Sequence, residues 1–407
     1  MSYSSKIKSR SQINKLKLTL LLDVTNAINN NLSKVQLFET YRDILVHQLK
    51  IGKIQLYTFE NEWKLIISEG VDDSVRINPS EDLENIKDIL VLNNHKNTVL
   101  HQFGVVVPIF HKTKPLAYLL LNDFDGEKIE VSPIIRHLSF IKTLTNIVMV
   151  AIENKKLYKE AIEKAAMKRE LELASEMQHL LFPSVFPNNE NVEIDAFYQP
   201  HHEVGGDYYD VIQLNNDEIL FCMADVSGKG VSAALLMSNL QASLRVLAHT
   251  TSSLFELVNI INHKIQESAN KEKYITMFLA KYNFSSRRLN YINAGHIPPL
   301  LYEQGRVKEL NSGTTILGMF DKLPFVKEGN ISINKNAVLL CYTDGVEETE
   351  NKLGEAFGID RVKNILIRHS GDEIKNLLNA IMNNIESFKI KEKPYSDDIT
   401  LMGIRFK

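Results

Sequence analysis

The sequence predicts a mixed α+β protein whose C-terminal half is built on largely antiparallel sheets. Two observations lead to this class. Strand-like runs of the C-terminal half cluster around a central pair of helical segments and do not alternate regularly with helices, which argues against a doubly wound parallel sheet. A second group of strands, nearer the N-terminus, lies between two helical segments and predicts a smaller α/β domain.

Composition places the chain among ordinary globular proteins. It has 407 residues, of which 44% are hydrophobic and 24% are charged, and at roughly 150 residues per domain it should form two to three domains. The 47 basic and 50 acidic residues leave a net charge of −3, so we expect no nucleic-acid partner. Cys222 and Cys341 lie in apolar runs, as expected of buried thiols in a reducing, cytoplasmic compartment.

The N-terminal segment is basic and contains no acidic residue before Asp23. Asp23 interrupts the apolar stretch 18–22 and no small-residue cleavage site follows, so we expect no signal peptide. No window offers about 18 uncharged apolar residues, so we also expect no membrane span. Residues 1–17 are predicted to be a basic flexible arm, with contact to a membrane surface as the alternative.

Residues 18–152 are predicted to form the first domain. Apolar residues at three- and four-residue spacing predict helices over 32–49 and 134–158. Ser132 and Pro133 fit the N-cap and the first position of the second helix. Between the helices, strands are expected at 54–59, 63–68, 105–110 and 116–122. This order and size resemble the GAF small-ligand-sensing domain, which implies an unknown small ligand or partner here.

Residues 153–187 are predicted to be a linker that continues the preceding helix. The segment up to residue 182 is rich in Ala, Glu, Lys and Leu and holds no Gly or Pro. Pro183 and Pro187 then end the helix. Its apolar residues indicate pairing with a second copy, as a coiled coil in a homodimer. A solvated single spacer is the alternative, and both remain open.

Residues 188–407 are predicted to form the second domain. Strands are expected at 192–198, 208–214, 219–224, 277–283, 288–294, 299–303, 337–342 and 399–406. Helices are expected at 231–248, 254–270, 359–369 and 374–388.

Four aspartate sites stand where these strands meet loops: Asp207, Asp225, Asp344 and the pair Asp397–Asp398. One such residue would be an ordinary turn or cap residue, but four in one domain indicate a binding site made of oxygen ligands. Mg²⁺ and Mn²⁺ prefer such ligands, whereas zinc would need a His/Cys cluster that the sequence lacks. Two such ions can activate a shared water and neutralise a phosphoryl group.

Six motifs, in order, carry a resemblance to a known family. They occupy 173–183, 205–210 (Gly-Gly-Asp-Tyr-Tyr-Asp), 224–230 (Ala-Asp-Val-Ser-Gly-Lys-Gly), 293–299 (Asn-Ala-Gly-His-Ile-Pro-Pro), 342–346 (Tyr-Thr-Asp-Gly-Val) and 397–400 (Asp-Asp-Ile-Thr). Residues 172–406 thereby resemble the metal-dependent phosphatases of the protein phosphatase 2C superfamily. Within it, they are most similar to the bacterial stage II sporulation protein E type and to serine phosphatases that regulate stress sigma factors.

The resemblance implies a β-sandwich flanked by helices and a site with two Mn²⁺ or Mg²⁺ ions. Asp225 would bridge the ions, and the carbonyl of Val226 would add a ligand to the second. Asp344 and Asp397 would complete the first ion's ligands, and Asp207 would hold an ion directly or through water. Asp398 is not expected to be a ligand.

The same motifs contain two further residues with expected roles, His296 and Lys229. His296 is expected to be a buried, hydrogen-bonded scaffold histidine, with a general acid as the alternative. The phosphate-binding arginine of the animal enzymes has no visible counterpart, which leaves Lys229 as the candidate.

The sequence therefore predicts a sensor-regulated protein-serine/threonine phosphatase, with a phosphorylated regulatory protein such as an anti-sigma-factor antagonist as substrate. Rival readings share fragments of the motifs. Residues 205–209 resemble the GGDEF signature of cyclic-dinucleotide synthases, but Tyr208 replaces its acidic residue. Residues 225–230 resemble one box of the histidine-kinase ATP lid, without the other boxes. An inactive pseudophosphatase scaffold would not need all four aspartate sites.

Overall fold

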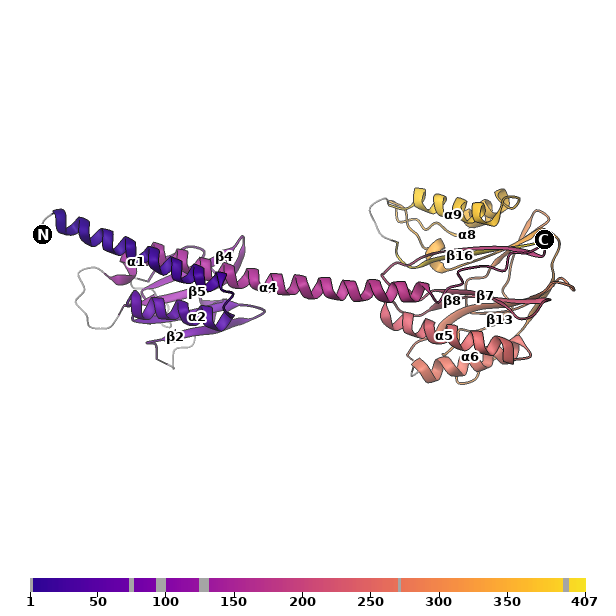
Figure 1. Ribbon diagram of the computed structural model, residues 1–407, viewed down its shortest axis with the longest axis horizontal. Coiled ribbons are helices and arrows are strands. Elements are labelled where there is room, and N and C mark those ends of the chain that lie inside the picture. Colours follow the sequence, from indigo (N-terminus) through magenta and orange to yellow (C-terminus); the bar gives the residue numbers. More distant parts are fainter. Residues whose placement is uncertain (1–2, 73–76, 93–99, 124–131, 270–271, 391–394) are drawn as a thin grey trace. The chain divides into compact units, whose positions relative to one another are not determined.

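The computed structural model (Figure 1) describes residues 3–72, 77–92, 100–123, 132–269, 272–390 and 395–407. The chain divides into two compact units, Met1–Ala165 and Ala166–Lys407. The predicted boundaries, after residues 152 and 187, lie on either side of this division. Each unit has hydrophobic cores of its own.

The N-terminal unit contains an antiparallel sheet with strand order β2-β1-β5-β4-β3. Helices cover one face of this sheet, and their side chains form a shared core with it. The hydroxyl of Tyr41 lies 2.6 Å from that of Thr145 inside this core and joins two of the helices. The strands are β1 (Lys53–Phe59), β2 (Trp63–Glu69), β3 (Leu90–Val91), β4 (Val105–His111) and β5 (Lys114–Asn122), and the helices are α1 (Tyr3–Asn29), α2 (Lys34–Asp43), the π-helix η1 (Ile44–Gln48), α3 (Pro79–Asp82) and the 3₁₀ helix η2 (Leu100–Gln102).

The N-terminal segment differs from the prediction. Residues 3–17, expected to be a flexible arm, form the first part of α1. The physical reason lies further along the same helix, where Leu20, Val24 and Ala27 are buried in the core of the unit. Once this apolar face is packed, the helix extends back through a segment that contains neither Gly nor Pro.

Helix α4 (Pro133–His179) is one continuous helix of 47 residues, as the linker prediction required. It begins in the N-terminal unit and ends in the C-terminal unit. Within the described chain, α4 and α5 (Val231–Thr250) are long and apolar enough to cross a membrane by length and composition alone. Both bury part of that apolar surface, as core helices of soluble proteins also do, so the expected absence of a membrane span stays a prediction.

The C-terminal unit is a sandwich of two sheets covered by helices on both outer faces (Figure 1). The first sheet has the order β13-β10-β9-β8-β7, with β14 also paired to β10, and the second has the order β12-β11-β15-β16-β6. Helices α5 and α6 cover the first sheet, and α8 and α9 cover the second. The predicted sandwich flanked by helices is therefore confirmed.

The elements of this unit lie close to their predicted positions. The strands are β6 (Val192–Gln199), β7 (Tyr208–Gln213), β8 (Glu218–Val226), β9 (Ile275–Asn283), β10 (Arg288–Ala294), β11 (Leu300–Glu303), β12 (Arg306–Glu309), β13 (Gly313–Thr314), β14 (Gly329–Ser332), β15 (Ala337–Tyr342) and β16 (Ile399–Phe406). The helices after α5 are α6 (Leu254–Ala269), α7 (Asp344–Glu347), α8 (Ile359–Arg368) and α9 (Ile374–Phe388).

One charged pair ties a covering helix to the first sheet. Asp210 on β7 is fully buried, and Arg245 on α5 donates to both of its carboxylate oxygens, at 2.7 and 3.1 Å. The hydroxyl of Tyr208 donates to the same carboxylate. Asp210, the last residue of the 205–210 motif, therefore has a structural role, because a carboxylate can be buried at low cost only when its oxygens accept hydrogen bonds.

We predict that Arg245→Met lowers the free energy of unfolding by about 3 kcal/mol, because it leaves the Asp210 carboxylate buried without its cationic partner. Urea unfolding measures the effect. Arg368→Met, which removes an exposed arginine at the end of α8, serves as the control and should change stability by less than about 0.5 kcal/mol. Equal losses in the two variants would contradict the role of the pair.

Candidate active site

Strand register brings Asp207 and Asp225 to the same edge of the first sheet. In the antiparallel pair β7–β8, Tyr208 lies opposite Ala224. Asp207 precedes Tyr208 and Asp225 follows Ala224, so both aspartates stand one residue beyond this pair. Asp207 is buried, with 2% of its surface exposed.

The second sheet contributes its aspartates at the same edge of the sandwich. Tyr342 at the end of β15 lies opposite Leu401 near the start of β16. Asp344 therefore begins the short helix α7 just beyond β15, and Asp397 lies just before β16. Thr343, to which the sequence analysis assigned no role, lies between Tyr342 and Asp344, and its hydroxyl donates to Asp207 Oδ2 at 2.7 Å.

The carboxylate of Asp207 joins the two sheets. Its Oδ2 accepts hydrogen bonds from the hydroxyl of Thr343, after β15, and from that of Thr400 on β16. The backbone N–H of Thr343 also donates to the carbonyl of Thr400 at 3.1 Å. These contacts fix the start of β7 against the second sheet and hold the four aspartate sites at one edge.

Asp398 accepts backbone hydrogen bonds with both carboxylate oxygens, and its expected exclusion from the ligands stays a prediction. Its Oδ1 accepts from the N–H of His201 at 2.8 Å, and its Oδ2 accepts from the N–H of Gly206 at 2.8 Å. Two nearby positions must be glycine, because another backbone segment lies against each of them. A Cβ on Gly206 would lie 2.8 Å from the carbonyl oxygen of Val226, and one on Gly345 would lie 2.1 Å from the carbonyl oxygen of Asp398.

The last turns of α4 contact the same loop. Gln178 is buried and makes two hydrogen bonds to the backbone of Gly205: its Nε2 donates to the carbonyl at 2.8 Å, and its Oε1 accepts from the N–H at 3.1 Å. Phe182 packs its ring against Tyr198 and Tyr209, with centroid distances of 4.7 and 5.0 Å. The end of α4 and the segment after it thus pack on this domain, and no sequence motif indicated the role of Gln178.

Burial and mutual repulsion raise the pKa values of three aspartates at this edge. Burial, followed by the charges of Asp344 and Asp397, raises the pKa of Asp225 to about 7. Burial and the charge of Asp225 raise the pKa of Asp207 as well. Burial also raises the pKa of Asp344, helped by the charge of Glu348. Such a group binds a cation favourably, because the cation relieves the repulsion.

The donor set fits hard divalent cations. The aspartates at this edge offer carboxylate oxygens, and the Val226 carbonyl lies beside Gly206. Within the described parts of the chain, no three His, Cys, Asp or Glu side chains converge closely enough to hold an ion as they stand. One nearby cation belongs to the protein itself, since Lys229 Nζ lies 2.9 Å from Asp397 Oδ2.

His296 lies in the core near this edge. It is buried, its Nδ1 lies 2.9 Å from the hydroxyl of Thr276, and its backbone N–H donates to Asn293 Oδ1 at 2.8 Å. Burial lowers the pKa of His296 to about 4, although the backbone of Tyr342 opposes this shift. A neutral, packed imidazole agrees with the expected scaffold role.

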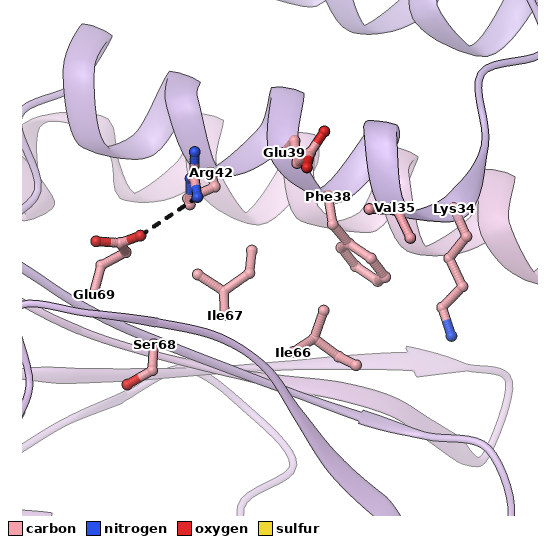
Figure 2. Close-up of a pocket in the computed structure, with 9 residues that line it drawn as sticks. All are labelled: Lys34, Val35, Phe38, Glu39, Arg42, Ile66, Ile67, Ser68 and Glu69. Atoms are coloured by element: carbon pink, nitrogen blue, oxygen red, sulfur yellow. Dashed lines mark ion pairs between the residues drawn. The ribbon is translucent and has the colours of Figure 1, made fainter. Parts of the chain in front are cut away.

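The N-terminal unit has grooves of its own. Figure 2 shows one, of about 520 Å³, in which apolar side chains from α2 and β2 face each other. Arg42 Nη1 and Glu69 Oε1, 3.7 Å apart, close one end of this groove. A second groove of about 410 Å³ is lined by the rings of Phe59, Trp63 and Tyr118, among others. Both are large enough for a small ligand.

Comparison with known proteins identifies the C-terminal unit. Residues 215–407 match the family described as stage II sporulation protein E (SpoIIE). The C-terminal unit is a SpoIIE-type serine phosphatase domain. The matched range contains Asp225, Asp344 and Asp397, while Asp207 lies just before it. The family that the sequence motifs indicated is thus confirmed. Phosphatases of the protein phosphatase 2C type, to which this family belongs, depend on metal ions.

Individual relatives agree with this family. The phosphoserine phosphatase RsbU of Bacillus subtilis is 27% identical over 246 residues, which is 59% of this chain and 71% of RsbU. The phosphoserine phosphatase RsbP of Bacillus subtilis is 31% identical over 186 residues, covering 44% of this chain and 45% of RsbP. The chain therefore spans less than half the length of RsbP.

A solved structure supports the fold of the SpoIIE-type domain. The protein phosphatase 2C domain of SiaA from Pseudomonas aeruginosa aligns with a TM-score of 0.55 at 20% identity, over 61% of this chain and all of that domain. At this identity the likeness concerns the fold alone. The GAF resemblance of the N-terminal unit stays a prediction.

We predict that His296 makes the stability of the SpoIIE-type domain fall in mild acid. Its folded-state pKa lies below the ordinary value of 6.5, so the folded state binds fewer protons than the unfolded state. The stabilisation is complete above about pH 6.5 and is lost as the pH falls towards 4, by roughly 2 kcal/mol at pH 5.

The test compares urea unfolding at pH 7 and pH 5, in EDTA, for the wild type and for His296→Gln. The variant cannot titrate at this position and should lose roughly 2 kcal/mol less between the two pH values. An identical loss in both proteins would contradict the prediction.

Proposed function

We propose that the chain is a protein-serine/threonine phosphatase that uses two divalent ions, Mn²⁺ or Mg²⁺, and is controlled through its N-terminal unit. The observation that carries the proposal is the gathering of four aspartate sites at one edge of a SpoIIE-type sandwich, around the doubly hydrogen-bonded Asp207. The substrate would be a phosphoserine on a regulatory protein, such as an anti-sigma-factor antagonist, and the site of action cytoplasmic.

Asp207, Asp225, Asp344 and Asp397, with the carbonyl of Val226, would hold the ions. When bound, the ions lower the pKa of a water molecule and neutralise charge on the phosphoryl oxygens. Thr343 and Thr400 orient the carboxylate of Asp207 by hydrogen bonds. Asp398 fixes the backbone of the loop that carries Asp207.

Control through α4 is supported by its contacts with the domain. Gln178 bonds to Gly205, two residues before Asp207 in the sequence, and the side chain of Gln241 on α5 donates to the carbonyl of Leu181 at 3.4 Å. A shift of the last turn of α4 would thus reach the loop of a proposed metal ligand. Since packed helices favour discrete arrangements, such a shift would act as a switch of metal occupancy.

Pairing of α4 in a homodimer is supported by its exposed middle section. Residues 154–170 are all exposed, although they include Leu157, Tyr158 and Ile162, with exposures of 50%, 71% and 51%, which share one side of the helix with Ala161 and Ala165. Apolar side chains along a helix are stabilised when a second helix covers them. The signal that acts on this arrangement would be a small ligand or a partner bound by the N-terminal unit, for which the two grooves are the candidate sites.

We predict that the metal-free protein is inactive and that Mn²⁺ restores phosphate release from p-nitrophenyl phosphate and from a phosphoserine peptide. Asp225→Asn removes the central carboxylate and should reduce turnover by a factor of about 10³ or more, as the loss of transition-state charge stabilisation does elsewhere.

Asp360→Asn, at an exposed position of α8, is the matched control and should retain wild-type rates. Substantial activity in EDTA, or a fully active Asp225→Asn, would refute the two-ion assignment. A wild-type protein that is inactive with Mn²⁺ and Mg²⁺ would instead favour a pseudophosphatase scaffold.

We predict that insertions near Ala165 act by rotation. Two residues rotate the following part of α4 by about 200°, whereas seven nearly restore its orientation, at about 100° per residue. The two-residue insertion should therefore weaken the dimer and change the specific activity at limiting Mn²⁺, and the seven-residue insertion should resemble the wild type. Light scattering and the phosphatase assay measure both effects, and three proteins that behave alike would show α4 to be a passive tether.

A further inference from the structure

Lys229 lies beside a proposed metal ligand. It belongs to the loop between β8 and α5, which begins two residues after Asp225. Its Nζ lies 2.9 Å from Asp397 Oδ2 and donates to the carbonyl of Ser396 at 2.8 Å. The side chain of Lys229 is still 46% exposed, so its ammonium group can leave Asp397 for another partner without crossing the core.

The ammonium group of Lys229 and a divalent ion would meet at the same carboxylate, that of Asp397. Oδ1 of Asp397 accepts a hydrogen bond from the backbone N–H of Asp398 at 2.9 Å, and Oδ2 lies 2.9 Å from Lys229 Nζ. A divalent ion at Oδ2 would repel the ammonium group beside it, since both are cations. In the described chain no three ligand side chains converge, and the ammonium group of Lys229 supplies positive charge at this carboxylate edge. Binding of a divalent ion to Asp397 would therefore displace Lys229.

The loop is built so that Lys229 can move while its base stays fixed. The base is held by Ser227, whose N–H donates to the carbonyl of Tyr274 at 2.9 Å and whose hydroxyl accepts from the N–H of Tyr274 at 2.9 Å. Gly228 and Gly230 flank Lys229 with φ angles of +90° and +73°, and a Cβ on Gly230 would meet nothing within 4 Å. The two glycines place no Cβ beside Lys229, so its long side chain can turn about its own single bonds while Ser227 holds the base of the loop.

We propose that Lys229 holds Asp397 in the metal-free protein and transfers its ammonium group to the substrate's phosphate when the ions bind. The proposal rests on the proposed phosphatase function and supplies the cationic phosphate contact for which the sequence offers no arginine. One side chain thus couples metal binding to phosphate binding, because the ion that binds Asp397 also releases the ammonium group of Lys229 to bind the phosphate.

The first experiment measures Mn²⁺ binding by calorimetry, without turnover. Lys229→Met removes the competing cation and should tighten Mn²⁺ binding by about two- to fivefold, the size of a partly exposed ion pair. Lys363→Met is the matched control, because Lys363 makes a similar ion pair with Glu309, at 2.7 Å, elsewhere in the same unit. It should leave Mn²⁺ affinity unchanged.

A double-mutant cycle separates displacement from a general charge effect. In an Asp397→Asn background the ion pair is already lost, so adding Lys229→Met should no longer tighten Mn²⁺ binding. If Lys229→Met tightens binding equally in both backgrounds, or in neither, Lys229 does not compete for Asp397 and the proposal fails.

The second experiment titrates the Mg²⁺-saturated protein with inorganic phosphate. Lys229→Met should weaken phosphate binding by roughly tenfold or more, as expected for a lost charge-assisted hydrogen bond. Lys229→Arg should keep it within about threefold, since the charge is retained. Unchanged phosphate affinity in Lys229→Met would overturn the transfer, and because neither titration measures catalysis, this result is distinct from a failure of the phosphatase assay.

Discussion

The C-terminal sandwich depends on one buried carboxylate. Asp207 precedes the first sheet's β7, yet its Oδ2 is bonded by the hydroxyls of Thr343 and Thr400, which belong to the second sheet. Burying a carboxylate next to Asp225 is unfavourable, as the raised pKa values of both residues indicate. The two hydroxyls offset part of this cost, and they do so only when the two sheets meet in register. The same contacts therefore close the sandwich and collect its aspartates.

Much of this architecture was predictable from the sequence. Continuous apolar runs identified buried strands such as β8 and β15, and helical spacing identified α5, α6, α8 and α9, each within a few residues of its observed bounds. Short strands such as β12 and β14 were missed, because their few residues carry no periodicity and their pairing is set by neighbours distant in the sequence. The helical start of the chain was missed for a related reason: the buried residues that fix α1 lie beyond the basic segment.

The aspartates of the candidate site could be predicted from the sequence, but the hydrogen bonds and the ion pair that connect them to other residues could not. Motifs singled out Asp207, Asp225, Asp344 and Asp397, and the register of β7–β8 and β15–β16 explains why strand ends so far apart in sequence share one edge. Hydrogen bonds between distant residues leave no such pattern. Thr343, Gln178 and the ion pair of Lys229 with Asp397 became visible only in three dimensions, although Thr343 and Lys229 stood within the motifs themselves.

The contact between Gln178 and Gly205 also bears on where the catalytic domain begins. A fragment that begins after Phe182 would lose both hydrogen bonds of Gln178 to the Asp207 loop and the packing of Phe182 against the rings of Tyr198 and Tyr209. The last turns of α4 are thus part of the catalytic domain, which extends beyond its two sheets towards the N-terminus. In a fusion or an exchange of input domains, the junction would have to fall upstream of Gln178 for the catalytic domain to remain whole.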